Sequence, residues 1–190
     1  MANTATLNAP TTPGRRAPRS QSRNKGVPAL KQQADVESNR QQVERWMRLS
    51  RKELDAIYLK ARPGRLPLGD TRGTALFAGW PGAAVFSRMA RAAWQGKVFD
   101  LPGSVKDTGV VVNKILPKGW KLIVAKAYQG QSWLDGKPTL VIDYSTTSVV
   151  ARLIRDEIRE VAPGLYLGKV WIGKRRVLDF ALEQPDPTQA

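Results

Sequence analysis

The chain has 190 residues, 42% of them apolar, which is enough for one domain with a core and some extensions. It contains no cysteine and no histidine, which excludes disulfides, thiolate and zinc centres, and mechanisms that need a histidine base or a cysteine nucleophile. The net charge of +15 favours anionic partners. No apolar run is long enough to span a membrane, and the first thirty residues lack the apolar segment of a secretory signal. We therefore expect a cytoplasmic protein without a bound metal or cofactor.

Residues 1–34 form a basic segment, with six Arg or Lys residues, no acidic residue and few bulky apolar side chains. Such a segment cannot bury enough surface to offset the entropy of ordering, so we predict a disordered tail. A basic tail attracts polyanions, and Arg15, Arg16, Arg19 and Arg23 are the candidate contacts for a nucleic acid or an anionic membrane. A solubilising tail and an organellar transit peptide are the alternatives.

Residues 35–96 are predicted to be helical. Order is expected to begin near Asp35, with Ser38 and Gln41 as a capping box, and a second capping box is formed by Ser50 and Glu53. The apolar residues of these two helices recur at helical spacing: Val43, Trp46, Met47, Leu54, Ile57 and Tyr58. The pair is expected to pack on the rest of the protein by a narrow apolar face.

A third helix is predicted over residues 82–96, after a loop-rich stretch over 63–82. Gly96 is a suitable residue to end this helix. The residues expected on its buried face are Val85, Phe86, Met89, Ala93 and Trp94.

The hydrophobic pattern changes to a period of two in the segment 97–183. The predicted strands are 110–116, 120–128, 138–144, 165–172 and 176–182, separated by turns rich in Gly and Pro. Leu178, Phe180 and Leu182 share one face of the last strand, and Tyr144 and Asp143 lie on opposite faces of another. Short strands at such spacing predict an α+β protein in which N-terminal helices precede an antiparallel meander that closes into a barrel. The tail 184–190 is predicted to be disordered.

The segment 148–161 fits two patterns. As a helix it carries one apolar stripe that ends before Pro163, and the number of apolar residues that match each pattern slightly favours the helix. As a strand it forms a hairpin around Pro163 and Gly164, and then only one of Arg159 and Glu160 can face the barrel interior.

A short element, W-x-G-K-x-F, begins the predicted barrel at Trp94. It is followed by VIDY (141–144), by IREVAPGLYLGKVW (158–171) and by a final apolar strand. This order, over about residues 79–183, resembles bacterial GXWXG-type domains of unknown function, although Ala78 and Ala92 stand where that motif has its first glycine. The barrel also resembles calycins, the lipocalin-like proteins, which implies a pocket for a small apolar ligand.

Several polar and aromatic residues fall among the predicted strands. A barrel of this kind has room inside for side chains or one small ligand, and an arginine there could receive a carboxylate or carbonyl group. The predicted ligand-binding residues are Asp143, Tyr144, Arg155, Arg159, Tyr166 and Trp133. The alternative is that these charges lie on the surface of a helix, with Arg152 and Asp156 as a pair.

We therefore predict non-enzymatic binding of a small apolar or amphipathic ligand inside the barrel. Association with nucleic acid or an anionic membrane through the basic tail is one alternative. A second is a histidine-free acid/base enzyme, an isomerase or hydrolase, that uses Asp143 or Glu157 beside a tyrosine and needs a carboxylate with a raised pKa.

Overall fold

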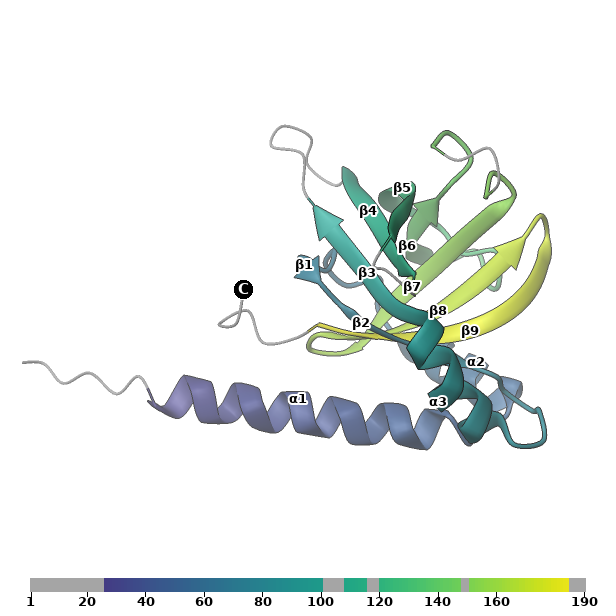
Figure 1. Ribbon diagram of the computed structural model, residues 1–190. Helices are drawn as coiled ribbons and strands as arrows, with labels where there is room; N and C mark the ends of the chain where they lie inside the picture. The colour runs from purple at the N-terminus through teal and green to yellow at the C-terminus, as the bar shows by residue number, and fades with distance from the viewer. Residues whose placement is uncertain (1–25, 101–107, 116–119, 148–150, 185–190) are drawn as a thin grey trace, which may run out of the picture.

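A computed structural model describes residues 26–100, 108–115, 120–147 and 151–184. These residues form three helices, α1 (Gly26–Trp46), α2 (Arg51–Lys60) and α3 (Ala83–Ala93). They also form nine strands: β1 (Gly69–Asp70), β2 (Arg72–Leu76), β3 (Trp94–Asp100), β4 (Thr108–Ile115), β5 (Trp120–Gln131), β6 (Pro138–Asp143), β7 (Ile154–Ala162), β8 (Leu165–Ile172) and β9 (Arg175–Glu183). The protein is α+β, as the sequence predicted, and its helices lie around one end of a curved sheet (Figure 1).

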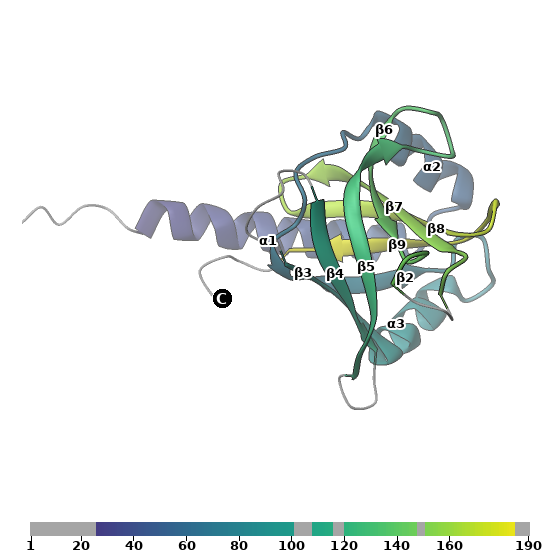
Figure 2. The ribbon, with the colours of Figure 1, turned by 90° about the horizontal axis from the view of Figure 1, so that it is seen from above.

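The strands described form a single antiparallel sheet in the order β1-β3-β4-β5-β6-β7-β8-β9-β2. Its two edge strands, β1 and β2, are consecutive in the chain and are separated by Thr71 alone. Thr71 donates both its backbone N–H and its hydroxyl to the carbonyl of Lys97, at 2.8 and 2.7 Å. One continuous segment thus pairs with β3 at its start and with β9 at its end, which brings the sheet round into a nearly closed barrel (Figure 2).

Two glycines allow the strands to approach closely where the barrel closes. Gly96 has a φ of +127°, and a Cβ at this position would lie 2.1 Å from the carbonyl oxygen of Thr71. A Cβ at Gly73 would lie 2.7 Å from the Cα of Gly96. Gly96 therefore does not end a helix, as its position suggested, but lies within β3, beside a register shift that follows Trp94.

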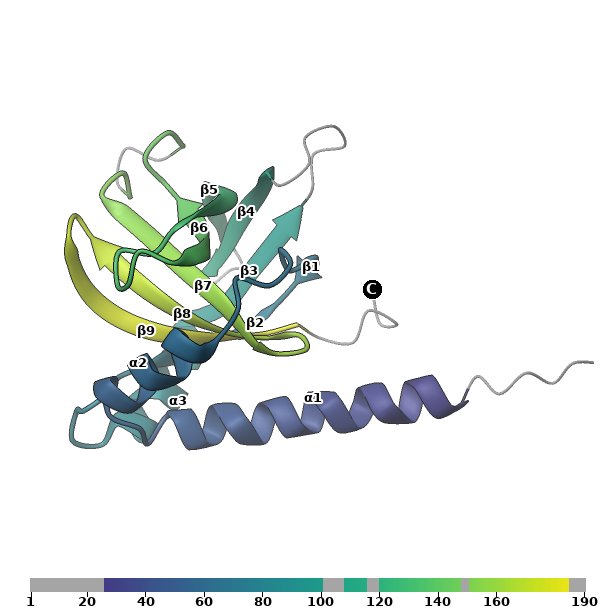
Figure 3. The same cartoon turned by 180° about the vertical axis from the view of Figure 1, so that it is seen from behind.

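The core has two parts, one inside the barrel and one between the barrel and the helices. Inside, buried side chains come from β3 to β9 and include Phe99, Ile142, Ile158 and Phe180. Outside, α1 and α2 pack on the outer face of the sheet, as Figure 3 shows from behind. That outer part contains the predicted helix residues Val43, Trp46, Met47, Leu54 and Tyr58 together with Leu76, Leu165, Leu167 and Ala181. The barrel wall is thus buried on both faces along part of its circumference.

The strand predictions and the second helix are confirmed. The capping box of Ser50 and Glu53 is present at the start of α2. Leu178, Phe180 and Leu182 face the interior, as do Leu140, Ile142 and Tyr144. These segments alternate clearly because each has one face in the barrel interior.

The predicted N-terminal boundary is wrong. Helix α1 begins at Gly26 and runs through Ser38, so Ser38 caps no helix and order does not start at Asp35. The stretch from Ala29 to Ala34 is composed of good helix formers, and it extends the helix although it adds no apolar face. The rest of the predicted tail, residues 1–25, and the segment 185–190 lie outside the described residues.

Two other predictions need correction. The stretch 63–82 contains β1 and β2, so the sheet is not confined to residues 97–183. The expected buried face of the third helix is also wrong, because Val85 and Met89 of α3 are 57% and 66% exposed and Trp94 belongs to β3. β2 lacks an alternating pattern since four of its five residues are buried, and this hid it from sequence analysis.

The segment that fitted two patterns is a strand over Ile154–Ala162, and the slight preference for a helix is wrong. Here too, both faces of the strand are buried, so apolar and charged residues do not alternate simply. The turn at Pro163 and Gly164 connects β7 to β8, as the hairpin reading required. Across the described parts of the chain, no helix is both long enough and apolar enough to cross a membrane.

Candidate functional site

A cavity of about 200 Å³ lies inside the barrel. Its wall is mainly apolar, and its lining is Trp94, Lys97, Asn113, Tyr144, Ala151, Ile154, Asp156, Val170, Leu178 and Phe180. Trp94, Ile154, Val170 and Leu178 are partly exposed, whereas the polar lining residues are buried. The polar groups therefore lie at the closed end of the cavity and apolar side chains surround its more open part.

Four polar residues at the closed end form one network, which we call the interior quartet: Lys97, Asn113, Tyr144 and Asp156. The Lys97 ammonium donates to Asn113 Oδ1 at 2.6 Å, to the Tyr144 hydroxyl at 2.7 Å and to Asp156 Oδ2 at 2.8 Å. The Tyr144 hydroxyl accepts a further bond from Asn113 Nδ2 and donates to Asp156 Oδ2, both at 2.9 Å. Four strands, β3, β4, β7 and the end of β6, thus contribute to one buried polar group.

Aromatic rings surround the Lys97 ammonium as well. Its nitrogen lies 5.5 Å from the ring centroid of Trp94, 5.4 Å from that of Tyr144 and 5.5 Å from that of Phe180. These distances are within the range of cation–π attraction. The cation is therefore stabilised both by oxygen acceptors and by the faces of the cavity wall.

The protonation states of the quartet follow from these contacts. Burial alone favours a neutral amine, but the nearby Asp156 carboxylate outweighs it and raises the pKa of Lys97. Burial and the same carboxylate raise the pKa of Tyr144 to about 12. At neutral pH the lysine is therefore charged and the tyrosine is protonated.

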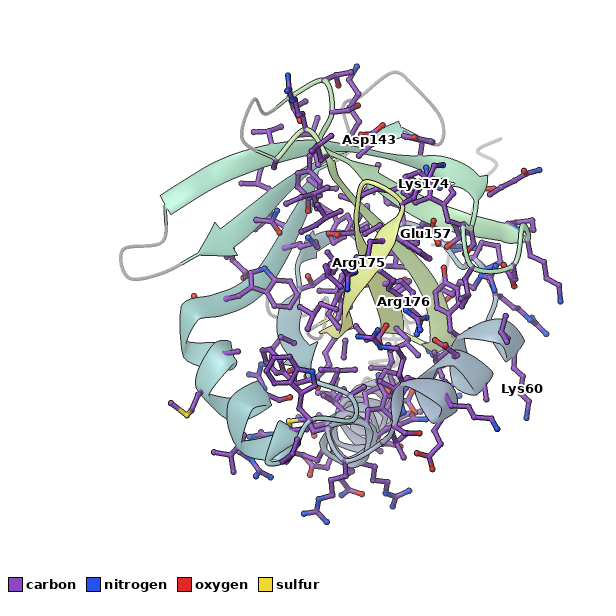
Figure 4. All side chains as sticks on the ribbon, turned by 90° about the vertical axis from the view of Figure 1, so that its right-hand side faces the viewer. Lys60, Asp143, Glu157, Lys174, Arg175 and Arg176 are labelled. Carbon is purple, nitrogen blue, oxygen red and sulfur yellow. The ribbon has the colours of Figure 1, made fainter. Side chains whose placement is uncertain are left out.

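A second polar network lies on the outer face of β7, the strand whose inner face carries Asp156 of the interior quartet. We call Tyr58, Asp135, Glu157 and Arg159 the outer cluster, because they lie between β7 and α2. Glu157 accepts bonds from the Ser132 hydroxyl at 2.6 Å, the Trp133 backbone N–H at 2.8 Å and Arg155 Nε at 3.1 Å. Figure 4 shows Glu157 between Asp143, near the top of the view, and Lys60 of α2, at the lower right.

Arg159 is fully paired within the outer cluster. It forms two parallel bonds to Asp135, at 2.7 and 2.9 Å, and donates to the backbone carbonyls of Tyr58, Lys137 and Pro138. These contacts use all five N–H donors of a guanidinium. The hydrogen bonds from Arg159 lower the pKa of Asp135. Arg159 therefore faces away from the cavity, and no donor remains for a ligand.

The structure brings only part of the sequence-predicted site together. Tyr144 lines the cavity. Tyr166 is buried in the interior core but outside the cavity lining, and its hydroxyl donates to the carbonyl of Arg65. Arg155 and Trp133 contact each other on the outer face, where the guanidinium carbon lies 4.4 Å from the ring centroid.

Asp143, the candidate acid or base, also lies on the outer face. Burial opposes its ionisation, but hydrogen bonds from Ser145 and Tyr128 outweigh this effect and lower its pKa. The acid/base alternative needs a carboxylate with a raised pKa, so Asp143 has the wrong shift for that role.

Sequence reasoning missed Lys97, Asn113 and Asp156 as members of the site. Lys97 was visible only as part of W-x-G-K-x-F, and Asp156 only as a possible ion-pair partner, either of Arg159 inside the barrel or of Arg152 on a helix surface. An isolated lysine and asparagine within apolar strands, at Lys97 and Asn113, were the available signal. Polar residues at inward positions of a barrel are costly unless paired, and this identifies them once the register is known.

The structure gives no indication of a metal centre, since no group of three or more potential acidic ligands is found among the residues that it describes. No protein-family model and no curated protein matches the chain. Among solved structures, a crystal structure of a protein from Thermomonospora curvata is similar, with 19% sequence identity and a TM-score of 0.48. The similarity covers 80% of this chain and 99% of that one, and at this level it supports no statement about function.

Proposed function

We propose that the barrel binds a small, mainly apolar molecule in its interior, without covalent chemistry. The observation that carries this proposal is the cavity of about 200 Å³ with apolar walls and one polar group at its closed end. A cavity of roughly 150 Å³ in another protein is known to hold a benzene molecule. Apolar walls supply affinity and a few placed polar groups supply orientation, which is the usual composition of a ligand pocket.

The chemistry of the quartet favours binding over catalysis. A nucleophilic or basic lysine must be neutral, but Asp156 raises the pKa of Lys97. A tyrosine acting as a general base needs a pKa near the working pH, whereas that of Tyr144 is about 12. Neither group is prepared for proton transfer at neutral pH.

The W-x-G-K-x-F element supports the more specific proposal that this is a calycin-like binding barrel. Trp94 and Lys97 line the cavity, and Phe99 is part of the interior core. Gly96 permits the close strand approach at the closure. Each of the four residues that define the element thus acts in forming or closing the interior.

The test is titration of the ¹⁵N-labelled full chain with toluene, followed by amide chemical shifts. We expect saturable shifts in residues of β3, β7 and β9 that line the cavity. The variant Leu178→Trp should abolish them, because the new ring fills the cavity. Val177→Trp is the matched control, since Val177 is the adjacent residue of β9, is 40% exposed and does not line the cavity, so the shifts should be unchanged. Absence of saturable shifts in the wild-type protein, or equal shifts in Leu178→Trp, would contradict the proposal.

A further inference from the structure

The hydrogen-bonding capacity of the interior quartet is used unequally. An ammonium has three donors, and those of Lys97 all have acceptors within the quartet. The Tyr144 hydroxyl donates once and accepts twice, so it too is complete. Neither Lys97 nor Tyr144 can therefore offer a new bond to a ligand without breaking an existing one.

Asp156 differs from these two residues. Its Oδ2 accepts from Lys97 and Tyr144, but its Oδ1 is buried and has no hydrogen-bond partner in the described part of the protein. Only 3% of the residue is exposed, and it lines the cavity. Burying a carboxylate oxygen without a donor is energetically unfavourable, so a ligand in the cavity that donates to this atom would be stabilised.

Asn113 has some remaining capacity. Its amide nitrogen uses one N–H on Tyr144 and its oxygen accepts from Lys97, so one further N–H and one lone pair are free. At the closed end of the cavity, Asp156 Oδ1 can therefore accept a hydrogen bond from a ligand, and Asn113 can donate or accept a weaker one.

Charge limits the ligand further. The Lys97 ammonium and the Asp156 carboxylate neutralise each other at 2.8 Å. A carboxylate ligand would meet the Asp156 carboxylate without a free cationic donor, and like charges in a buried site repel strongly. A cationic amine would meet the Lys97 ammonium in the same way.

We propose that the cavity selects neutral molecules that present a hydrogen-bond donor, an alcohol or phenol hydroxyl on a small apolar body, with the hydroxyl on Asp156 Oδ1. This inference rests on the proposed function and specifies the ligand class. It contrasts with the expectation from the sequence that an arginine would receive a carboxylate, because Arg159 lies outside and is saturated. A water molecule that donated to Asp156 Oδ1 would be displaced at a loss by a ligand without a donor.

The test compares three ligands of similar size on the wild-type chain by isothermal titration calorimetry and amide shifts: benzyl alcohol, benzyl methyl ether and benzoate. We expect benzyl alcohol to bind about tenfold more tightly than the ether, which lacks the donor, and benzoate not to bind. Equal or tighter binding of the ether, or binding of benzoate, would overturn the inference and leave the proposed function standing. If neither these compounds nor toluene bind, the proposed function itself fails.

A pair of double variants locates the selectivity. Lys97→Met with Asp156→Leu removes the interior ion pair, and the preference for the alcohol should disappear while the ether still binds. Arg159→Met with Asp135→Leu removes the matched ion pair on the outer face and should leave the tenfold preference unchanged. A preference that survives in the first variant, or is lost in the second, contradicts the role of Asp156. The comparison of wild-type affinities remains decisive if either variant does not fold.

Discussion

The two faces of β7 carry similar charges but use them differently. On the outer face, Glu157 and Arg159 have donors and acceptors for nearly every polar atom, supplied by α2 and by the turn between β5 and β6. On the inner face, Asp156 has one oxygen fully used and the other without a partner. A buried charge therefore does not identify a site by itself. What distinguishes the interior is incomplete pairing beside a cavity.

We expect the two networks to differ most in the loss of stability when the cation of each one, Lys97 or Arg159, is removed. Lys97→Met leaves the Asp156 carboxylate buried without its counter-ion, and we expect a loss of about 3–5 kcal/mol in the free energy of unfolding. Adding Asp156→Leu should recover most of this loss, since an apolar pair of similar size often replaces a buried ion pair without cost. Urea denaturation of the single and double variants measures both. A single variant as stable as the wild type would contradict a stabilising ion pair between Lys97 and Asp156.

Arg159→Met is the corresponding change on the outer face, and a smaller effect is expected. Asp135 is at the edge of the cluster, with 10% of its side chain exposed, so water can reach it when the guanidinium is removed. The lost charged hydrogen bonds predict a decrease of about 2–3 kcal/mol in the free energy of unfolding. Toluene binding should not change. A loss larger than that of Lys97→Met, in the same denaturation assay, would reverse the comparison between the faces.

The sequence predicted the outline of this architecture but not which face of β7 holds the site. In β9, large apolar residues (Leu178, Phe180 and Leu182) alternate with Val177, Asp179 and Ala181, so this strand was found although its second half is buried. β2 and β7 are also covered on both sides, but their residue types do not alternate in this way, and β7 resembled a helix. The direction of the Arg159 and Asp156 side chains depends on strand register, which is fixed by pairing with the neighbouring strands β6 and β8. The direction of the Lys97 side chain depends in the same way on the closure of the barrel at Thr71, whose backbone N–H donates to the Lys97 carbonyl.

We expect alkaline pH to lower the free energy of unfolding through Tyr144 by less than either Lys97→Met or Arg159→Met does. Burial raises the pKa of Tyr144 to about 12, above its value of about 10 in the unfolded chain. The folded protein holds this proton more tightly than the unfolded chain does. The contribution of Tyr144 to the free energy of unfolding is therefore fully present below pH 10 and is lost as the pH rises towards 12. For Tyr144 alone we expect a decrease of about 1 kcal/mol at pH 11 relative to pH 8.

Tyr144→Phe tests this contribution through the slope of stability against pH. The variant should lose stability less steeply between pH 10 and 12, whatever its stability at pH 8. Tyr58 of the outer cluster also has a pKa raised to about 12, mainly by burial, so Tyr58→Phe is the matched control and part of the slope should remain in each single variant. An unchanged slope in Tyr144→Phe would mean that this hydroxyl does not titrate differently in the folded and unfolded states.

The smallest effect is expected at Trp133, which the sequence suggested as a ligand-binding residue. The residue is 38% exposed, and its ring lies on the outer face, with its centroid 5.7 Å from that of Trp171 and within cation–π distance of Arg155 and Lys174. Loss of one edge-to-face contact and of exposed cation–π contacts predicts that Trp133→Ala lowers the free energy of unfolding by about 1 kcal/mol. Because no part of the ring lines the cavity, the affinity for toluene and benzyl alcohol should be unchanged in calorimetry. A weaker affinity for both ligands would mean that the entrance of the cavity lies near Trp133, on the outer side of β8. A weaker affinity for the alcohol alone would mean that the loss of the ring affects Asp156 through Arg155 and Glu157.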